Sequence, residues 1–261
     1  MFFKTQDSIP QGLGFKAFDL THLLWLFTII LACISACFIC KKLSQNRQNV
    51  MLKSLGIVII FQEMLKNVIV AAIGEFEVGY LPFHLCGINI LLIAFDIFKP
   101  TKIVRAFLYF FCIPGALLAL LFPNWTEVPF LNFFHLHSFI IHGLLVMYPL
   151  LLITSGQLKL KFSDMPKSIG LLILMAIPIY FLNLLWDTNF MFLMQPDKGN
   201  PLEMFEKLLG NHLWGFPILL PLVVGLMYLP VFIVNKVKNN KITIEQKEYE
   251  VTTKQQEGLM D

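Results

Sequence analysis

Long apolar stretches separated by short polar or charged segments dominate the hydropathy pattern of the chain. They are about 20 residues long, which is the length that a helix needs to cross a bilayer. We therefore predict seven transmembrane helices, with ends that shift by a few residues, at 19–40, 51–73, 81–98, 103–122, 132–154, 168–187 and 212–235.

Composition supports this interpretation, because 57% of the 261 residues are hydrophobic and only 14% are charged. The expected fold is an all-α, polytopic membrane domain over 19–235. A polar extracellular segment at 1–18 precedes it, and a cytoplasmic tail at 236–261 without apolar periodicity is expected to be disordered. After the sixth span, Asn200 and Pro201 have the residue types of a helix cap and first position and predict a short amphipathic helix on the outer surface.

The distribution of basic residues sets the orientation. One side of the predicted membrane carries only Lys4, Lys16, Lys198 and Lys207, whereas the loops of the other side and the tail hold many more lysines and arginines. The positive-inside rule then places the N-terminus outside and the C-terminus in the cytoplasm of a multi-pass cell-membrane protein. The net charge of +3 is too small to indicate a nucleic-acid partner.

The first turns of the third span contain an imidazole, a thiol and a carboxamide, from His84, Cys86 and Asn89. Polar groups at such depth cost free energy unless they have partners, so they are candidates for function. Cys86 and Asn89 are three residues apart and share a helix face. The chain holds five cysteines, all in or beside apolar runs, and we predict no disulfides.

The second span is the most polar, with Gln62, Glu63, Lys66 and Asn67 in mid-membrane. Glu63 and Lys66 are three residues apart and are expected to form an ion pair on one face. Such a pair serves equally well to join helices or to form one wall of a polar cavity.

Histidines mark the fifth span. His135, Ser138 and His142 recur at helical spacing on one face, and His137 is expected to point away from it. His142 lies about 15 Å along the helix, too deep for an interfacial side chain. In the sixth span Asn183 and Asp187 share a face.

These side chains suggest one pocket open to the outer leaflet. A thiol beside an imidazole is the minimal set for covalent acyl transfer, because the imidazole accepts the thiol proton while sulfur attacks a carbonyl. An amide from Asn89 or Asn183 could donate to the oxyanion. The expected substrate-binding residues are His84, Asp187, Asn189, Glu63 and Asn67.

Three motifs together resemble the YwaF-type family of bacterial integral membrane proteins: LPFHLC at 81–86, FIIHG at 139–143, and TNFMFLMQP at 188–196 after Asn183. That family resembles eukaryotic transmembrane acyltransferases, which move fatty acyl chains between phospholipids. The resemblance implies that Cys86 carries the acyl group, that His142 is its base and that membrane phospholipids are the substrates. Phe190 stands where the resemblance leads us to expect tyrosine, so a headgroup-binding hydroxyl is missing there.

Two other functions remain open. A zinc-dependent intramembrane lipid hydrolase could use His84, His142 and Asp187 as ligands, although the sequence lacks a helical His-x-x-x-His pair. A transporter or sensor could use the same cavity for a ligand, although no internal repeat supports a transporter. For the preferred acyltransferase we expect neither a metal nor a cofactor.

Overall fold

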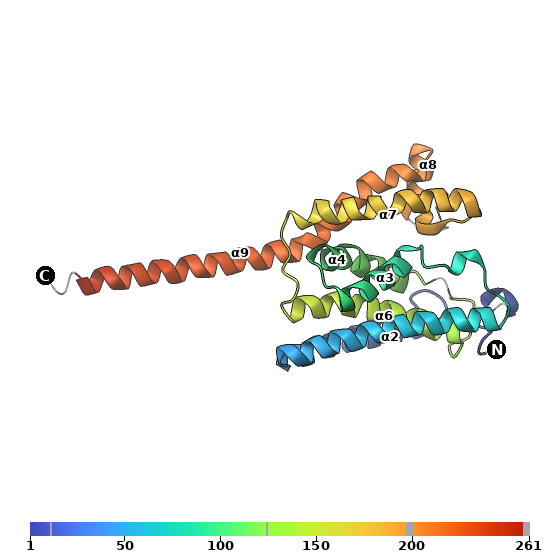
Figure 1. The fold of residues 1–261 in the computed structure, drawn as a ribbon, viewed down its shortest axis with the longest axis horizontal. Helices are drawn as coiled ribbons and strands as arrows, with labels where there is room; N and C mark the ends of the chain where they lie inside the picture. The colour runs from blue at the N-terminus through green and yellow to red at the C-terminus, as the bar shows by residue number, and fades with distance from the viewer. Residues whose placement is uncertain (11, 124, 197–200, 258–261) are drawn as a thin grey trace.

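The computed structural model describes residues 1–10, 12–123, 125–196 and 201–257, and every regular element within them is helical (Figure 1). The main helices are α1 (Leu20–Lys42), α2 (Gln45–Ala72), α3 (Leu85–Phe98), α4 (Lys102–Phe107), α5 (Ile113–Leu121), α6 (Phe133–Thr154), α7 (Asp164–Trp186), α8 (Pro201–Leu209) and α9 (Gly215–Glu257). Short helices are η1 (Gln6–Ser8), η2 (Val78–Tyr80), η3 (Leu108–Cys112), η4 (Phe190–Phe192) and η5 (His212–Trp214).

Six helical segments of the described chain are long and apolar enough to cross a membrane. They correspond to the predicted spans except the third, so the multi-pass helical class is confirmed. The third apolar segment forms only α3, whose 14 residues make a helix of about 21 Å. A helix of that length is too short for a hydrocarbon core of about 30 Å.

Proline and glycine explain why helix is missing between α2 and α3. Gly74 adopts φ +78° and ends α2 with a Schellman motif, in which the Glu75 N–H donates to the Val70 carbonyl at 3.1 Å. Pro82 disfavours helical backbone at the preceding residue, and Leu81 is accordingly extended with ψ 148°. The continuous third span predicted from residue 81 is therefore broken, and residues 81–84 lie outside the helix.

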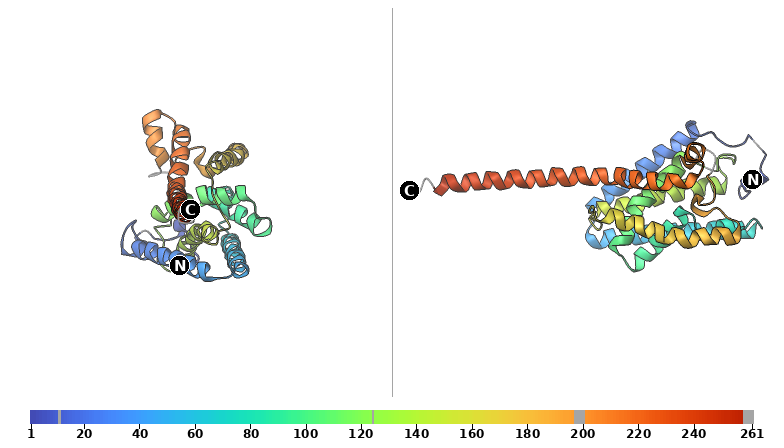
Figure 2. Two further views of the ribbon diagram at one scale, coloured as in Figure 1. Left: turned by 90° about the vertical axis from the view of Figure 1, so that its left-hand side faces the viewer. Right: turned by 90° about the horizontal axis from the view of Figure 1, so that it is seen from above.

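α6 lies at the centre of the bundle, in contact with α1, α2, α3 and α5 (Figure 2). Asn132 caps it by accepting a hydrogen bond from the Phe134 N–H at 2.8 Å. The same side chain donates to the carbonyl oxygens of Met1 and Lys4, at 3.1 and 2.8 Å. The N-terminal segment is thereby fastened across the beginning of α6.

α2 runs antiparallel to α3, and close packing at Gly56 fixes their register. A Cβ atom at Gly56 would lie 2.7 Å from the side chain of Ile97 and 3.5 Å from that of Tyr148 on α6. Counting about two turns outward along α2 from this contact leads to Glu63, and the same step along α3 leads to Asn89, with Cys86 about one turn further out. The predicted site residues of these two helices therefore lie at similar depths.

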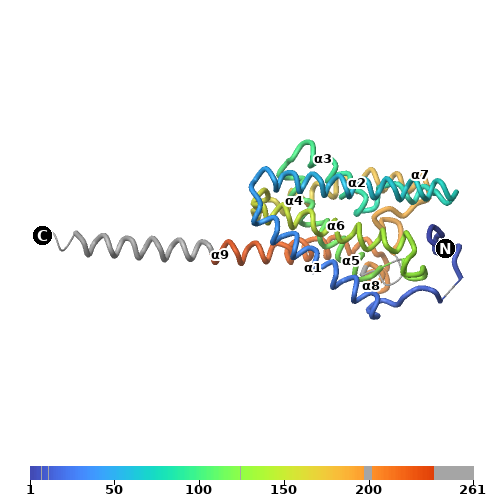
Figure 3. The backbone as a smooth tube through the Cα atoms, turned by 90° about the horizontal axis from the view of Figure 1, so that it is seen from below, coloured from blue at the N-terminus to red at the C-terminus, as the bar shows by residue number. Residues whose placement is uncertain are grey.

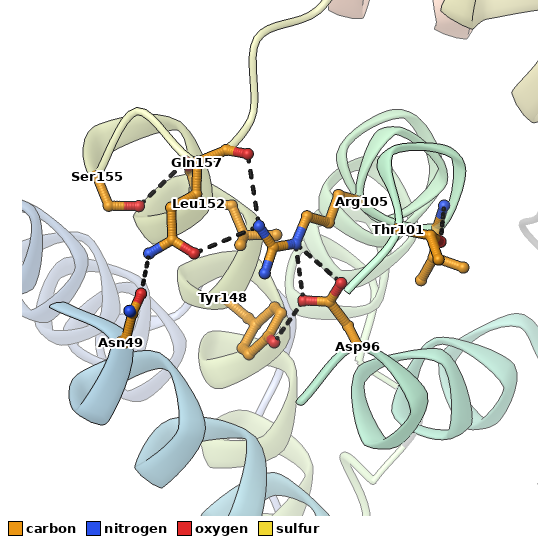
Figure 4. Close-up of polar contacts among 9 residues, drawn as sticks. Asn49, Asp96, Thr101, Arg105, Tyr148, Leu152, Ser155 and Gln157 are labelled. Atoms are coloured by element: carbon orange, nitrogen blue, oxygen red, sulfur yellow. Dashed lines mark hydrogen bonds and ion pairs between the residues drawn. The ribbon is translucent and has the colours of Figure 1, made fainter. Parts of the chain in front are cut away.

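A buried polar network holds the opposite ends of these helices together (Figure 4). Asp96 of α3, only 2% exposed, accepts from Arg105 Nε at 2.9 Å and from the Tyr148 hydroxyl at 3.0 Å. Arg105 NH1 also donates to Gln157 Oε1, and Gln157 donates to Asn49 at the beginning of α2. The ion pair thus joins α2, α3, α4, α6 and the segment after α6.

The fourth predicted span is one continuous rod, α4–η3–α5, with a π-helical segment in the middle. Within it, the Tyr109 hydroxyl donates to the Met227 carbonyl of α9 at 2.8 Å. Cys112 donates to the Leu145 carbonyl of α6 at 3.3 Å. Single-turn π segments occur often at functional sites.

α9 leaves the bundle at the end opposite the N-terminus (Figures 1 and 3). Its backbone is helical to Glu257, and residues 258–261 lie outside the described part; disorder of the tail from 236 stays a prediction. The predicted amphipathic helix is present as α8, with Leu202 and Phe205 buried and Leu208 exposed. Its predicted cap, Asn200, lies outside the described residues.

Candidate functional site

Cys86 lies in the first turn of α3, where the irregular segment enters the helix. His84 is the N-cap residue, with extended backbone at φ −68° and ψ 155°. A Cβ atom at Gly87 would lie 2.7 Å from the Cα of Pro82, so the turn packs directly on the helix and requires glycine.

Asn89 is the most unusual side chain of the site. It is 1% exposed, yet neither its amide oxygen nor its amide nitrogen has a hydrogen-bond partner among the described residues. Burying such a group without partners costs roughly 1–3 kcal/mol. It lies one turn deeper than Cys86 on neighbouring positions of the helix surface. An unpaired amide at this place is suited to bind a substrate atom.

Glu63 and Lys66 of α2 form the ion pair that the sequence predicts, with Lys66 Nζ donating to Glu63 Oε1 at 2.5 Å. The ammonium also lies over the ring of Tyr80, 5.9 Å from its centroid. The second carboxylate oxygen of Glu63 is 3.7 Å from Nε2 of His137. Glu63 therefore faces protein groups rather than lipid, as expected for a charge in the membrane.

Electrostatic interactions connect the thiol with this ion pair. The charges of Glu63 and Lys66 lie within electrostatic range of Cys86, and that of Lys66 lies within range of His142. The side chains of Cys86 and His142 are not hydrogen-bonded to each other in the described structure. Catalytic hydrogen bonds often form only when substrate is bound, and the partnership of Cys86 and His142 stays a prediction.

His142 is held in one orientation by its own helix. Its Nδ1 lies 2.7 Å from the Ser138 carbonyl oxygen. A carbonyl only accepts hydrogen bonds, so Nδ1 carries the proton and the neutral ring has its lone pair on Nε2. That nitrogen is the one able to accept a proton.

The histidine face of α6 differs from the sequence prediction. His135 accepts a hydrogen bond from Trp25 Nε1 at 2.9 Å and therefore faces α1. His137, expected to point away from the site, is the histidine that contacts Glu63. Spacing on one helix shows which residues share a face, but not which neighbour covers that face. The sequence held one indication of the contact between His137 and Glu63. Lys66 pairs with one carboxylate oxygen of Glu63, and the second oxygen needed a partner from another helix.

Asn183 of α7 has a structural role in this geometry. Its Oδ1 accepts from the Phe190 N–H at 2.8 Å and from the Thr188 hydroxyl at 2.9 Å, and its Nδ2 donates to the Phe190 carbonyl. These bonds use one of the two N–H donors of Nδ2, so Asn183 fixes the turn, and its role as an oxyanion donor stays a prediction.

The turn after α7 covers the beginning of α3. Asp187 ends α7 in the left-handed region at φ 50°. Asn189 binds backbone groups of Met194 and Gln195, so its amide also stabilises the turn. Phe190 is fully buried, and its ring lies 5.2 Å from the ring of His84. The third motif of the sequence thus packs on the first.

Two further carboxamides of α2 have unpaired buried oxygens. Oε1 of Gln62 and Oδ1 of Asn67 find no hydrogen-bond partner among the described residues. Both residues share the buried face of α2 with Glu63 and Lys66. The polar layer formed by α2, α3 and α6 therefore has more hydrogen-bonding groups than it satisfies.

The zinc alternative has little geometric support. No group of three or more His, Cys, Asp or Glu side chains that could hold a metal ion occurs in the described part of the chain. His84 instead packs against the rings of Phe190 and Phe192. Asp187 closes α7 through its backbone. The three ligands required of His84, His142 and Asp187 do not form one cluster.

Comparison with known families decides the relationship. Residues 17–234 match the sequence profile of the TMEM164 family. The chain belongs to the TMEM164 family. The match includes every helix from α1 to the membrane part of α9, and with them the three motifs that form the site. No curated protein and no solved structure matches this TMEM164-family chain.

Proposed function

We propose that this protein is an integral membrane acyltransferase that moves a fatty acyl chain between membrane phospholipids through a thioester on Cys86. The observation that carries the proposal is the pairing of Cys86 with Asn89, a buried amide without partners, at the beginning of a helix that starts inside the membrane. A nucleophile next to an unpaired donor is the arrangement that acyl transfer needs.

In the first half-reaction His142 Nε2 accepts the thiol proton as sulfur attacks the ester carbonyl of a phospholipid. The negative charge on the carbonyl oxygen is stabilised by Asn89 Nδ2. Collapse of this intermediate forms the Cys86 thioester and breaks the ester bond, and His142 returns the proton to the departing lysophospholipid. In the second half-reaction an acceptor hydroxyl attacks the thioester, and Cys86 regains its proton.

The other predicted residues support this chemistry in different ways. Glu63, Asn67 and His84 are proposed to bind substrate, whereas Asp187, Asn189 and Asn183 hold the turn that covers the site. Seven passes with an external N-terminus in the cell membrane complete the proposal, as in the YwaF-type proteins that the motifs resemble. The lysine asymmetry and the position of α9 opposite the N-terminus support this orientation.

Intact mass spectrometry of the purified protein tests the proposal. After incubation in phospholipid vesicles we expect an added mass equal to one acyl chain, located on Cys86 and removed by hydroxylamine. Cys86→Ser should carry no hydroxylamine-sensitive adduct, and Cys37→Ser, a partly exposed cysteine of α1, should behave like the wild type. Absence of any adduct on Cys86 during turnover would contradict a thioester mechanism.

A further inference from the structure

His137 is the histidine of the polar layer that the proposed first half-reaction does not use. Its Nε2 is buried and has no hydrogen-bond partner in the described structure. In the neutral ring, the tautomer with its proton on Nδ1 leaves a lone pair on Nε2, and that nitrogen can then take up a proton.

A carboxylate is placed where it stabilises the protonated form of this ring. Glu63 Oε2 lies 3.7 Å from His137 Nε2, and Lys66 holds the opposite oxygen. When His137 takes up a proton, the new imidazolium faces this carboxylate. The carboxylate faces the nitrogen that takes up the proton and stabilises the charge of the imidazolium there, whereas in hydrolase triads the acid bonds the opposite ring nitrogen.

The unpaired groups beside this pair indicate the chemistry of the ligand. Gln62 Oε1 and Asn67 Oδ1 are acceptors and require a donor such as a hydroxyl. Lys66 and Glu63 neutralise each other, so the layer offers no uncompensated positive charge for a phosphate. A hydroxyl group of an acyl acceptor, rather than a phosphate, fits these groups.

We infer that His137, supported by Glu63, is a second catalytic base that activates the hydroxyl of a lipid acceptor in the second half-reaction, with Gln62 and Asn67 binding that acceptor. This inference rests on the proposed acyltransferase function. The acceptor oxygen forms an ester bond with the thioester carbonyl carbon while the carbon–sulfur bond breaks. The hydroxyl proton passes to His137 Nε2, and the departing thiolate of Cys86 is protonated from it.

Separating the half-reactions tests the assignment. Wild-type protein is first loaded with a labelled acyl chain from phosphatidylglycerol vesicles, and lysophosphatidylglycerol is then added as acceptor. In His137→Gln we expect loading at the wild-type rate but discharge slower by about a hundredfold or more. Asn67→Leu should raise the acceptor concentration for half-maximal discharge without changing loading. A purely structural role would slow both steps together.

His135→Gln is the matched control, because His135 is a histidine of the same helix that bonds Trp25 outside the polar layer. It should load and discharge normally. Loss of loading in His137→Gln, with folding retained by thermal melting, would overturn the inference and make His137 a base for Cys86. Normal discharge in both His137→Gln and Asn67→Leu would also overturn it, while leaving the thioester intact. If wild-type protein forms no adduct, the proposed function itself fails.

Discussion

At the scale of single residues, the site is distinguished by polar groups that the fold leaves unsatisfied. Most buried polar side chains of this protein are paired: the ring nitrogens of His22, for example, bond the Phe18 N–H and the Leu120 carbonyl. Asn89 is an exception with both of its amide atoms unpaired. Sites that bind a ligand or a transition state commonly keep unpaired polar groups in the free protein, at a cost in folding stability. The substrate supplies the missing hydrogen-bond partner when it binds.

Asn89→Leu should therefore separate stability from activity. Replacing a buried, unpaired amide by an apolar side chain of similar size is expected to leave the unfolding free energy unchanged or raise it by about 1 kcal/mol. Acyl transfer should fall by about a hundredfold if the amide binds the oxyanion. Thermal melts and vesicle transfer assays measure the two effects. A strongly destabilised variant would mean that Asn89 has a structural partner.

Cys86→Ser and His142→Ala are expected to fold normally and to lose most of the transfer activity. A hydroxyl has a much higher pKa than a thiol and needs a stronger base than one imidazole in an apolar pocket. Because the two residues act as a unit, the double variant should be little worse than either single one. Additive losses in the transfer assay would show instead that they act independently.

Residue patterns predicted contacts within one helix better than contacts between helices. The Glu63–Lys66 pair follows from a spacing of three on α2 and is confirmed. His137 was missed, because its position on α6 says nothing about the side on which α2 packs. The turn that Asn183 holds was also missed, because its partners are backbone groups of Phe190 and the Thr188 hydroxyl, which spacing on α7 does not reveal.

At the scale of elements, the important feature is that α3 begins within the bundle. Irregular backbone at membrane depth is tolerated only where protein covers it or a polar cavity receives it. Here the turn at 81–84 is covered by the segment after α7, through contacts of Phe83 and His84 with Phe190. Hydropathy alone could not show that helix α3 begins only at Leu85, because the whole stretch 81–98 is apolar enough to be predicted as one span. Pro82 was the one indication in the sequence that helical backbone is disfavoured at its beginning.

Gly87→Ala tests whether the turn at Pro82 positions the thiol. An added Cβ would meet the Pro82 backbone at 2.7 Å, so the turn must move away from the helix. We expect slower acylation of Cys86 with the bundle still folded. Gly79→Ala is the control, because nothing lies within 4 Å of a Cβ atom there. Equal acylation rates in the two variants would show that the turn does not control the thiol.

The network around Asp96 fixes the register of α3 against α6, and Arg105→Ala should break it. The substitution leaves Asp96, which is 2% exposed, without its cation, and such losses cost about 3–5 kcal/mol. Tyr148→Phe removes one hydrogen bond and should cost about 1 kcal/mol. Lys102→Ala is the comparison: Lys102 pairs with Asp164 from a half-exposed position, where ion pairs contribute at most about 1 kcal/mol. Thermal or denaturant unfolding in detergent should reproduce this order.

At the scale of the whole molecule, the path of the chain determines which leaflet the polar layer is nearer to. α9 leaves the bundle at the end opposite the N-terminus (Figure 3). If the bundle spans the bilayer, the N-terminus and α9 lie on opposite sides of it, and the chain must cross an odd number of times. Six helices of spanning length give an even number, so an odd number of crossings requires α3 with its preceding turn as a further pass. The polar layer lies on the N-terminal side of the Asp96 network, nearer the leaflet that the N-terminus faces.

The orientation can be measured directly. Lysines and arginines concentrate on the side where α9 emerges, and all four tryptophans lie in or near the opposite half, so we expect the N-terminus outside. A fluorescent or enzymatic reporter fused after residue 261 should therefore be active only in the cytoplasm. A cysteine introduced at Lys4 should react with an impermeant maleimide from outside intact cells, and one at Lys159, between α6 and α7, should not. Labelling of Lys159→Cys together with an external reporter would reverse the orientation and place the polar layer nearer the cytoplasmic leaflet. Phospholipid supplied to that leaflet would then be the substrate to test first.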